Sequence, residues 1–228
     1  MKVFKTIYFW VDERLDMHDY IKKDILDKPV PRGLNVSFCF GGITFFLFVM
    51  LAVTGYFMTM YYVPSPEQAY DAVDYLTFEV PMGQVIRGVH HWSANLMMVT
   101  IFIHMLRVFI YGAYKKPREI NWLTGVCLLC LVMGFGFTGY LLPWDQKAFW
   151  ATKVGTNIMG TIPVAGNFML NLVRGGDGLG ALTLSRFYSV HVLFLPLATI
   201  IFLIAHFIMI RKQGVSDPLF RDEKRKVL

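Results

Sequence analysis

Four long apolar stretches constrain this chain more than any other feature of its sequence. They cover residues 36–61, 86–111, 122–142 and 188–210, and few of their positions are charged. Each is long enough to cross the hydrocarbon core of a bilayer as a helix, which takes about 20 apolar residues. Backbone polar groups in lipid must be satisfied within the chain, so helices are expected. With 55% hydrophobic residues among 228, the composition is that of one membrane domain.

The distribution of Lys and Arg predicts which helix ends share a side of the membrane. The first 33 residues hold seven, segment 112–121 holds three, and the tail after residue 210 holds six. Segment 62–85 holds none, and the longer segment 143–187 holds four. Both termini are therefore expected on the cytoplasmic or equivalent negative (n) side, and the two loops on the positive (p) side. The net charge of +6 then reflects topology and anionic lipid, with no nucleic-acid partner implied.

The segments outside the apolar stretches complete the predicted organisation. Residues 1–33 form an interfacial segment, because 3–26 place apolar positions at mostly helical spacing between charges. Residues 34–210 form the membrane domain, and 211–228 form a basic tail. The 143–187 loop combines Gly and Pro with apolar runs, which predicts short helices on the p-side surface. The expected fold is all-α: an integral membrane four-helix bundle with surface helices, and three cysteines give no disulfide framework.

Four histidines lie in the second and fourth stretches as two pairs, His90 with His104 and His191 with His206. The pairs are 14 and 15 residues apart, which gives about 21–22 Å of helix rise and net rotations of about −40° and +60°. These two helices run parallel, because successive spans alternate in direction. His90 is thus expected beside His191 near the p side, and His104 beside His206 near the n side. An intramembrane histidine is costly and usually functional, and four at matched depths favour ligand pairs over isolated polar contacts.

Glycines repeat the same spacing on the other two helices. Gly41 and Gly55 lie on the first, and Gly125 and Gly139 lie on the third, each pair 14 residues apart. A missing Cβ admits a flat ring or another backbone, although membrane helices also use glycine simply to pack. The shared spacing favours two layers with one haem each between the four helices. Two imidazoles on one iron leave no open position for substrate, which indicates electron transfer.

Basic residues lie close to both predicted layers. Two of them are three residues from a histidine, and two follow the second apolar stretch on the n side: Arg87, Arg107, Lys115 and Arg118. They are candidates to contact haem propionates. The alternative is that they are interfacial charges that extend to the membrane surface, and the sequence leaves both interpretations open.

Motifs along most of the chain indicate a family. From about residue 7 to residue 214 the chain resembles cytochrome b6, the short N-terminal-half cytochrome b of quinol-oxidising cytochrome bc complexes. The motifs that carry the resemblance are VDERL, CFGGIT, TGYFMTMYY, IRGVHHWSAN, HMLRVF, GAYKKPRE, GFTGYLLPWDQ, TLSRFYSVH and HFIMIRKQG. The 15-residue spacing of the second histidine pair also matches the b6 type.

The resemblance implies cofactors and further site residues. The two histidine pairs would ligate two b haems, and Cys39 would hold an additional c-type haem through one thioether. Without the resemblance, Cys39 would be read as a small apolar residue. Asp24 and Arg211 match residues associated with quinone reduction and proton uptake on the n side. The alternative for both is an ordinary interfacial charge.

The resemblance also implies a function within a larger complex. The chain would carry electrons from p-side quinol oxidation through the haems to n-side quinone, coupled to proton translocation by a Q-cycle. A subunit IV-like protein with the Pro-Glu-Trp-Tyr element, a Rieske Fe–S protein and a c-type cytochrome would be partners in a dimeric complex. A bacterial plasma membrane is preferred over a thylakoid membrane.

Two other classes of protein remain as alternatives. One is a dihaem membrane anchor that links a different soluble oxidoreductase to the quinone pool. It needs the histidine layers but neither Cys39 nor the PWDQ sequence at 143–146. The other is a non-redox four-helix channel or assembly protein, which leaves the matched histidines and glycines unexplained.

Overall fold

The computed structural model describes residues 2–15, 22, 34–176 and 178–216. The chain divides into two units. One is Asn35–Gly214, and the other combines the N-terminal residues to Leu34 with those from Val215 onward. Each unit is described by itself.

Four long helices make up most of the larger unit: α3 (Phe40–Thr59), α5 (Gly83–Ile110), α6 (Glu119–Leu141) and α10 (Leu195–Gln213). Extended back to Val36 before α3 and to Ala181 before α10, they give four segments long and apolar enough to cross a membrane. Large apolar side chains cover their outer surface; Phe46, Phe102 and Ile201, for example, are 61%, 51% and 59% exposed. Lipid is the solvent that suits such a surface. The predicted all-α fold with four spans is confirmed.

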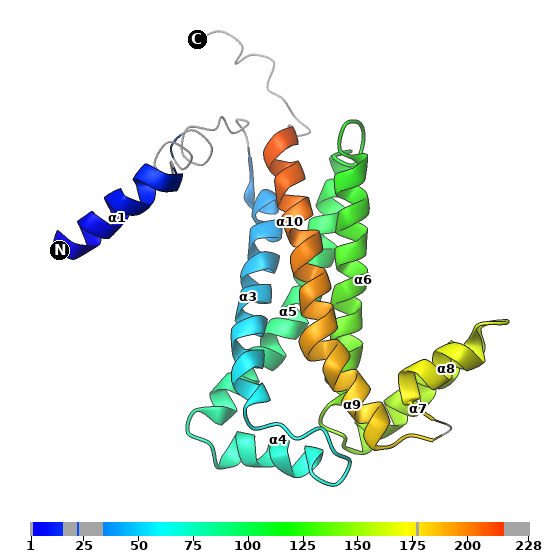
Figure 1. Ribbon diagram of the computed structural model, residues 1–228. Coiled ribbons are helices and arrows are strands. Elements are labelled where there is room, and N and C mark those ends of the chain that lie inside the picture. Colours follow the sequence, from blue (N-terminus) through cyan, green and yellow to red (C-terminus); the bar gives the residue numbers. More distant parts are fainter. Residues whose placement is uncertain (1, 16–21, 23–33, 177, 217–228) are drawn as a thin grey trace, which may run out of the picture. The chain divides into compact units, whose positions relative to one another are not determined.

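The four helices associate as two pairs (Figure 1). Helix α3 packs along α5, and α6 packs along α10, so each pair joins a glycine-bearing helix to a histidine-bearing one. The two histidine-bearing helices, α5 and α10, make little direct contact with each other. A small apolar core of Leu47, Met97, Ile101 and Val132 packs near the middle of the bundle. In sequence, Leu47, Met97 and Val132 lie about midway between the members of their 14-residue pairs, so the core separates the two layers.

Short helices gather at one end of this unit, where α3 ends and α5 begins (Figure 1). The 143–187 segment forms α7 (Gln146–Gly160), α8 (Gly166–Arg174) and α9 (Ala181–Ser189), so the expected short helices are confirmed. Helix α4 (Ala69–Phe78) occupies the 62–85 loop, for which the sequence indicates only a connection. Helix α5 also begins three residues earlier than its apolar stretch, at Gly83.

A buried arginine holds the short helices together. Arg174 is only 7% exposed, and its Nε donates to Thr156 Oγ1 at 2.8 Å. Its Nη2 donates to Asn157 Oδ1 at 2.7 Å and to the Lys153 carbonyl at 3.2 Å. The Thr183 hydroxyl on α9 donates to the Arg174 carbonyl at 2.8 Å. Because a buried cation must have its donors satisfied, these bonds fix α7, α8 and α9 relative to one another.

A π-helical turn, η3 (Val190–Phe194), connects α9 to α10. The Leu195 N–H donates to the Val190 carbonyl, five residues back. The cause lies at Pro196, which has no N–H and whose ring excludes the carbonyl four residues before it. A π turn accommodates one residue more than an α-helical turn. The 15-residue interval from His191 to His206 therefore keeps the register of a 14-residue interval in an uninterrupted α-helix.

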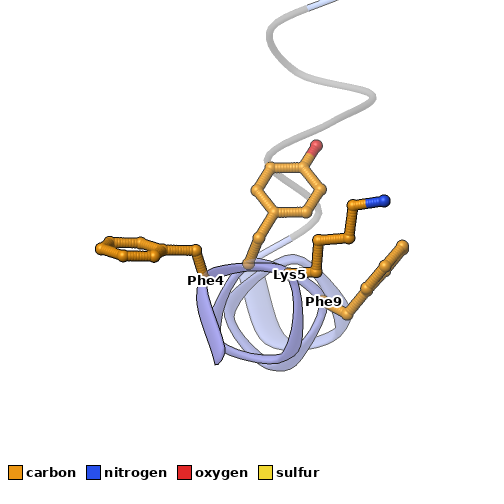
Figure 2. Close-up of a pocket in the computed structure, with 4 residues that line it drawn as sticks. Phe4, Lys5 and Phe9 are labelled. Carbon is orange, nitrogen blue, oxygen red and sulfur yellow. The ribbon is translucent and has the colours of Figure 1, made fainter. Parts of the chain in front are cut away.

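The described part of the smaller unit includes α1 (Lys2–Leu15). Phe4, Phe9 and Trp10 are exposed, at 81%, 65% and 58%, and the Arg14 guanidinium lies 4.2 Å from the centre of the Trp10 ring. Figure 2 shows Phe4, Lys5 and Phe9 extending outward from the helix around a shallow surface pocket. Residues 16–21 and 23–26 of the expected 3–26 helix lie outside the described residues. Helical structure is thus established for the first part of that segment.

Candidate functional site

The four histidines occupy two layers of the bundle. His90 and His104 lie on α5, His191 lies in the π turn, and His206 lies on α10. His90 is close enough to His191 for an electrostatic interaction, and His104 is likewise close to His206. The pairs are the ones that the sequence predicts. They are called the His90/His191 layer and the His104/His206 layer below.

Each of the four predicted glycines lies against one imidazole. A Cβ built on each would meet the Cε1 of a different histidine: 2.9 Å for Gly41 and His104, 3.2 Å for Gly55 and His90, 3.7 Å for Gly125 and His206, and 2.7 Å for Gly139 and His191. Carbon atoms in ordinary contact are about 3.5–4.0 Å apart, so a side chain at Gly41 or Gly139 would overlap the imidazole, and one at Gly55 would require His90 to shift slightly. The glycines thus make room for the histidine imidazoles. This role is more specific than the one expected from the sequence, which was space for a flat ring or another backbone.

Three threonines hold three of the imidazoles. The distance from the hydroxyl oxygen to the imidazole Nδ1 is 2.9 Å for Thr54 and His90, 3.2 Å for Thr124 and His206, and 2.8 Å for Thr138 and His191. Sequence reasoning missed these threonines. Their signal is a Thr-Gly pair at 54–55, 124–125 and 138–139, in which the glycine is the one that faces the same imidazole.

The residues present fit a bis-imidazole haem site in each layer. Each layer has two imidazoles, one from each helix pair, and a glycine behind each ring. A ring that donates through Nδ1 keeps the lone pair of Nε2 for a metal. The apolar core between the layers keeps the two sites separate. Such an arrangement can bind two flat, iron-containing macrocycles and position them for electron transfer.

Cys39 lies at the end of the bundle that contains His104. It is the N-cap residue of α3, two positions before the glycine that contacts His104. Its side chain is exposed and forms no disulfide. The thiol is thus accessible next to the His104/His206 layer, and a covalent cofactor at Cys39 remains a prediction.

The predicted propionate-binding arginines lie at opposite ends of α5. Arg87 donates from Nη1 to Thr77 Oγ1 at 3.2 Å, which ties α5 to α4. The Arg107 guanidinium lies 3.6 Å from the centre of the Phe38 ring and 4.9 Å from that of Tyr111. Each arginine is positioned by its neighbours at the level of one layer. A role toward propionates remains a prediction for both.

The remaining basic candidates cluster at the His104/His206 end. Arg118 is the N-cap residue of α6, and its Nη2 donates to the Gln213 carbonyl at 3.3 Å. Arg211 lies in the last turn of α10, and Lys115 lies in the turn between α5 and α6, near Gly112. Asp24 lies outside the described residues. The structure thus brings Lys115, Arg118 and Arg211 to the end of the bundle that contains Arg107.

A tyrosine pair, which sequence reasoning missed, lies at the other end. The Tyr62 hydroxyl donates to the Leu142 carbonyl at 2.7 Å, and its ring stacks on that of Tyr188 at 5.2 Å between centres. Burial, and secondly the nearby Tyr188, raise the pKa of Tyr62 above its usual value. Tyr62 therefore stays neutral and joins the ends of α3, α6 and α9.

The fold and site define a helical membrane protein with two layers of paired histidines between its long helices. The family model described as cytochrome b/b6/petB matches residues 25–214. This chain belongs to the cytochrome b/b6 family, an integral membrane family of oxidoreductase subunits whose members bind haem b.

Two relatives and one solved structure show how close the similarity is. The cytochrome b subunit of menaquinol:cytochrome c reductase from Bacillus subtilis is 52% identical over 95% of this chain and 100% of its own length. Cytochrome b6 of Heliobacterium mobile is 50% identical over 92% of this chain and 99% of its own. A chain of a hyperthermophilic respiratory Complex III superposes with a TM-score of 0.86 at 29% identity, over 96% of this chain and 58% of that one. The chain thus spans slightly more than half of that solved subunit.

Proposed function

We propose that this chain is the cytochrome b subunit of a quinol:cytochrome c-type oxidoreductase and carries electrons between the two membrane faces. The observation that carries the proposal is the pair of imidazole layers, each backed by glycines and separated by an apolar core. Haem iron with two imidazole ligands supplies reversible one-electron transfer when bound. The name of the Bacillus relative favours menaquinol as the reductant. The same similarity favours this assignment over a dihaem anchor for an unrelated soluble enzyme.

The chain's own residues would perform three tasks in this function. The four histidines would hold the haems through Nε2, and the threonines would keep a proton on the Nδ1 of three of them. The glycines allow each imidazole to lie against a neighbouring helix. The core of Leu47, Met97, Ile101 and Val132 excludes water from the space between the layers.

Quinol oxidation and quinone reduction would take place at opposite ends of the bundle. Quinol would be oxidised at the p-side end with α4 and α7–α9, where Tyr70 and residues 144–147 line a surface pocket. Quinone would be reduced near Arg211 and Asp24 on the n side. Oxidation on one side and reduction on the other move protons across the membrane by a Q-cycle. A subunit IV-like protein, a Rieske Fe–S protein and a c-type cytochrome would complete a dimeric complex.

Cys39 would hold a third, c-type haem through one thioether beside the His104/His206 layer. Its exposed thiol at the start of α3 supports this assignment. Acid–acetone extraction followed by a pyridine haemochrome spectrum tests it. We expect two extractable b haems and one haem retained on the wild-type polypeptide, with retention abolished in Cys39→Ala. Cys130→Ala, which removes another exposed thiol, is the matched control. Wild-type protein that retains no haem contradicts the assignment.

Replacing one ligand tests the layer assignment directly. His104→Leu removes an imidazole from the His104/His206 layer and leaves the other layer intact. We expect loss of one b haem, with much of the haem at the His90/His191 layer still present by low-temperature absorption and EPR. His91→Leu, which replaces the histidine next to His90, should retain both haems. Loss of only the His90/His191 haem in His104→Leu contradicts the pairing.

A further inference from the structure

The hydrogen bonds to the four imidazoles are unequal. Thr54, Thr124 and Thr138 each directly precede a glycine that faces a histidine, and each contacts the Nδ1 of that histidine. The fourth glycine of this set, Gly41, is preceded by Phe40, which has no hydroxyl. Position 40 is thus the one exception among the four equivalent positions.

The direction of the three hydrogen bonds follows from the threonine hydroxyls. Each hydroxyl has a single hydrogen, and each has a backbone carbonyl partner within its own helix. The distances are 2.6 Å from Thr54 to the Met50 carbonyl, 2.8 Å from Thr124 to that of Asn121, and 2.7 Å from Thr138 to that of Gly134. With the hydroxyl hydrogen used there, the oxygen accepts, so the imidazole Nδ1–H donates.

His104 differs from the other three histidines. Its Nδ1 is buried and has no hydrogen-bond partner among the described residues. The His90/His191 layer therefore has two imidazoles that donate to threonine, whereas the His104/His206 layer has one. A buried polar atom without a partner is rare, and here its cause is the phenylalanine at position 40.

Donation from Nδ1–H increases the electron density of the ring and makes Nε2 a stronger ligand. Stronger donation stabilises the ferric state, and hydrogen bonding around the axial ligands is one of the means by which a protein sets a haem potential. We propose that Thr54, Thr124 and Thr138 lower the reduction potentials of their haems through the axial imidazoles, and that Phe40 keeps the His104/His206 haem at higher potential. The proposal rests on the proposed bis-imidazole haem sites.

Thr54→Val and Thr54→Ser test the proposal as a matched pair in the purified complex. Valine keeps the shape of threonine but cannot accept the bond, whereas serine keeps the hydroxyl. Redox titration of the Thr54→Val complex should shift the His90/His191 haem to higher potential. Loss of one net hydrogen bond predicts about a two- to tenfold change in the equilibrium, or roughly 20–60 mV for one electron. Thr54→Ser should have the wild-type potential. The potential of the His104/His206 haem should stay unchanged in both variants.

Phe40→Thr tests the proposal in the opposite direction. It introduces a hydroxyl one residue before Gly41 and should lower the potential of the His104/His206 haem alone. Thr44→Val is the control, because Thr44 lies on the same helix but its hydroxyl contacts the Phe40 carbonyl at 2.8 Å and Thr100 Oγ1 at 3.0 Å, and no imidazole. It should leave both potentials unchanged.

Haem content tests the proposed function, and the haem reduction potentials test the role of the threonines. Wild-type protein without two b haems contradicts the proposed function. Two haems whose potentials do not move in Thr54→Val and Phe40→Thr, or move equally in Thr54→Val and Thr54→Ser, contradict the role of the threonines. A variant that loses haem is replaced by the corresponding change at Thr138, in the same layer, with the same expected direction.

Discussion

A glycine that faces an imidazole is the repeating unit of the site at the residue scale. The contact is closest at Gly139, where a Cβ would lie 2.7 Å from His191 Cε1. At Gly136, on the same helix, a Cβ would meet nothing within 4 Å. Two glycines three residues apart on one helix therefore have different surroundings, which only the tertiary contacts reveal.

Gly139→Ala should weaken the His90/His191 haem site. The added methyl overlaps the imidazole and forces it to move, an overpacking effect of about 1–3 kcal/mol. We expect reduced haem content or a perturbed EPR signal for that haem in the purified complex. Gly136→Ala should retain wild-type spectra. Equal spectra for both variants would show that His191 does not need the space.

The π turn is the element-scale feature on which the register of the fourth helix depends. Sequence reasoning with an ideal α-helix gives the two histidine pairs different rotations, about −40° and +60°. The turn at Val190–Phe194 absorbs the additional residue, so both pairs keep matched faces. Pro196 is the local cause, since its ring and missing N–H disfavour an α-helical bond at this point.

Two single-residue deletions should have opposite results. Deleting Leu193 together with Pro196→Ala removes both the additional residue and the cause of the π turn, which leaves a 14-residue α-helical interval. We expect this variant to retain both b haems. Deleting Ile201 keeps the π turn but rotates His206 by about 100°, so the His104/His206 haem should be lost. Dithionite-reduced absorption spectra measure the outcome, and haem loss from the first variant alone contradicts the register argument.

At the scale of the whole molecule, the charges outside the spans indicate which end of the bundle faces which side of the membrane. The short helices gather at the end of the bundle with the acidic 62–85 loop, whereas the Lys115–Lys116 turn lies between α5 and α6 at the other end. The positive-inside tendency predicts that this turn lies on the n side.

Cysteine labelling tests this predicted orientation. Glu67 and Lys116 are both exposed residues in connections. In right-side-out vesicles, Glu67→Cys should react with a membrane-impermeant maleimide, and Lys116→Cys should react only after the membrane is opened. The unsubstituted chain measures the background from its own three cysteines. The reverse labelling pattern contradicts the assigned sides.

The sequence by itself determined the four spans, the short helices in 143–187 and the depth of the histidines. These features follow from local composition and from residue spacing along one helix, and neither depends on contacts between helices. It could not show that each glycine faces an imidazole, that Thr54, Thr124 and Thr138 reach Nδ1, or that α4 exists. These are contacts between helices or depend on packing, as with Ala69 and Leu76 buried on α4. The tertiary structure also decided which histidine lacks a hydrogen bond, because only the packing of α3 on α5 places Gly41, and hence Phe40, next to His104.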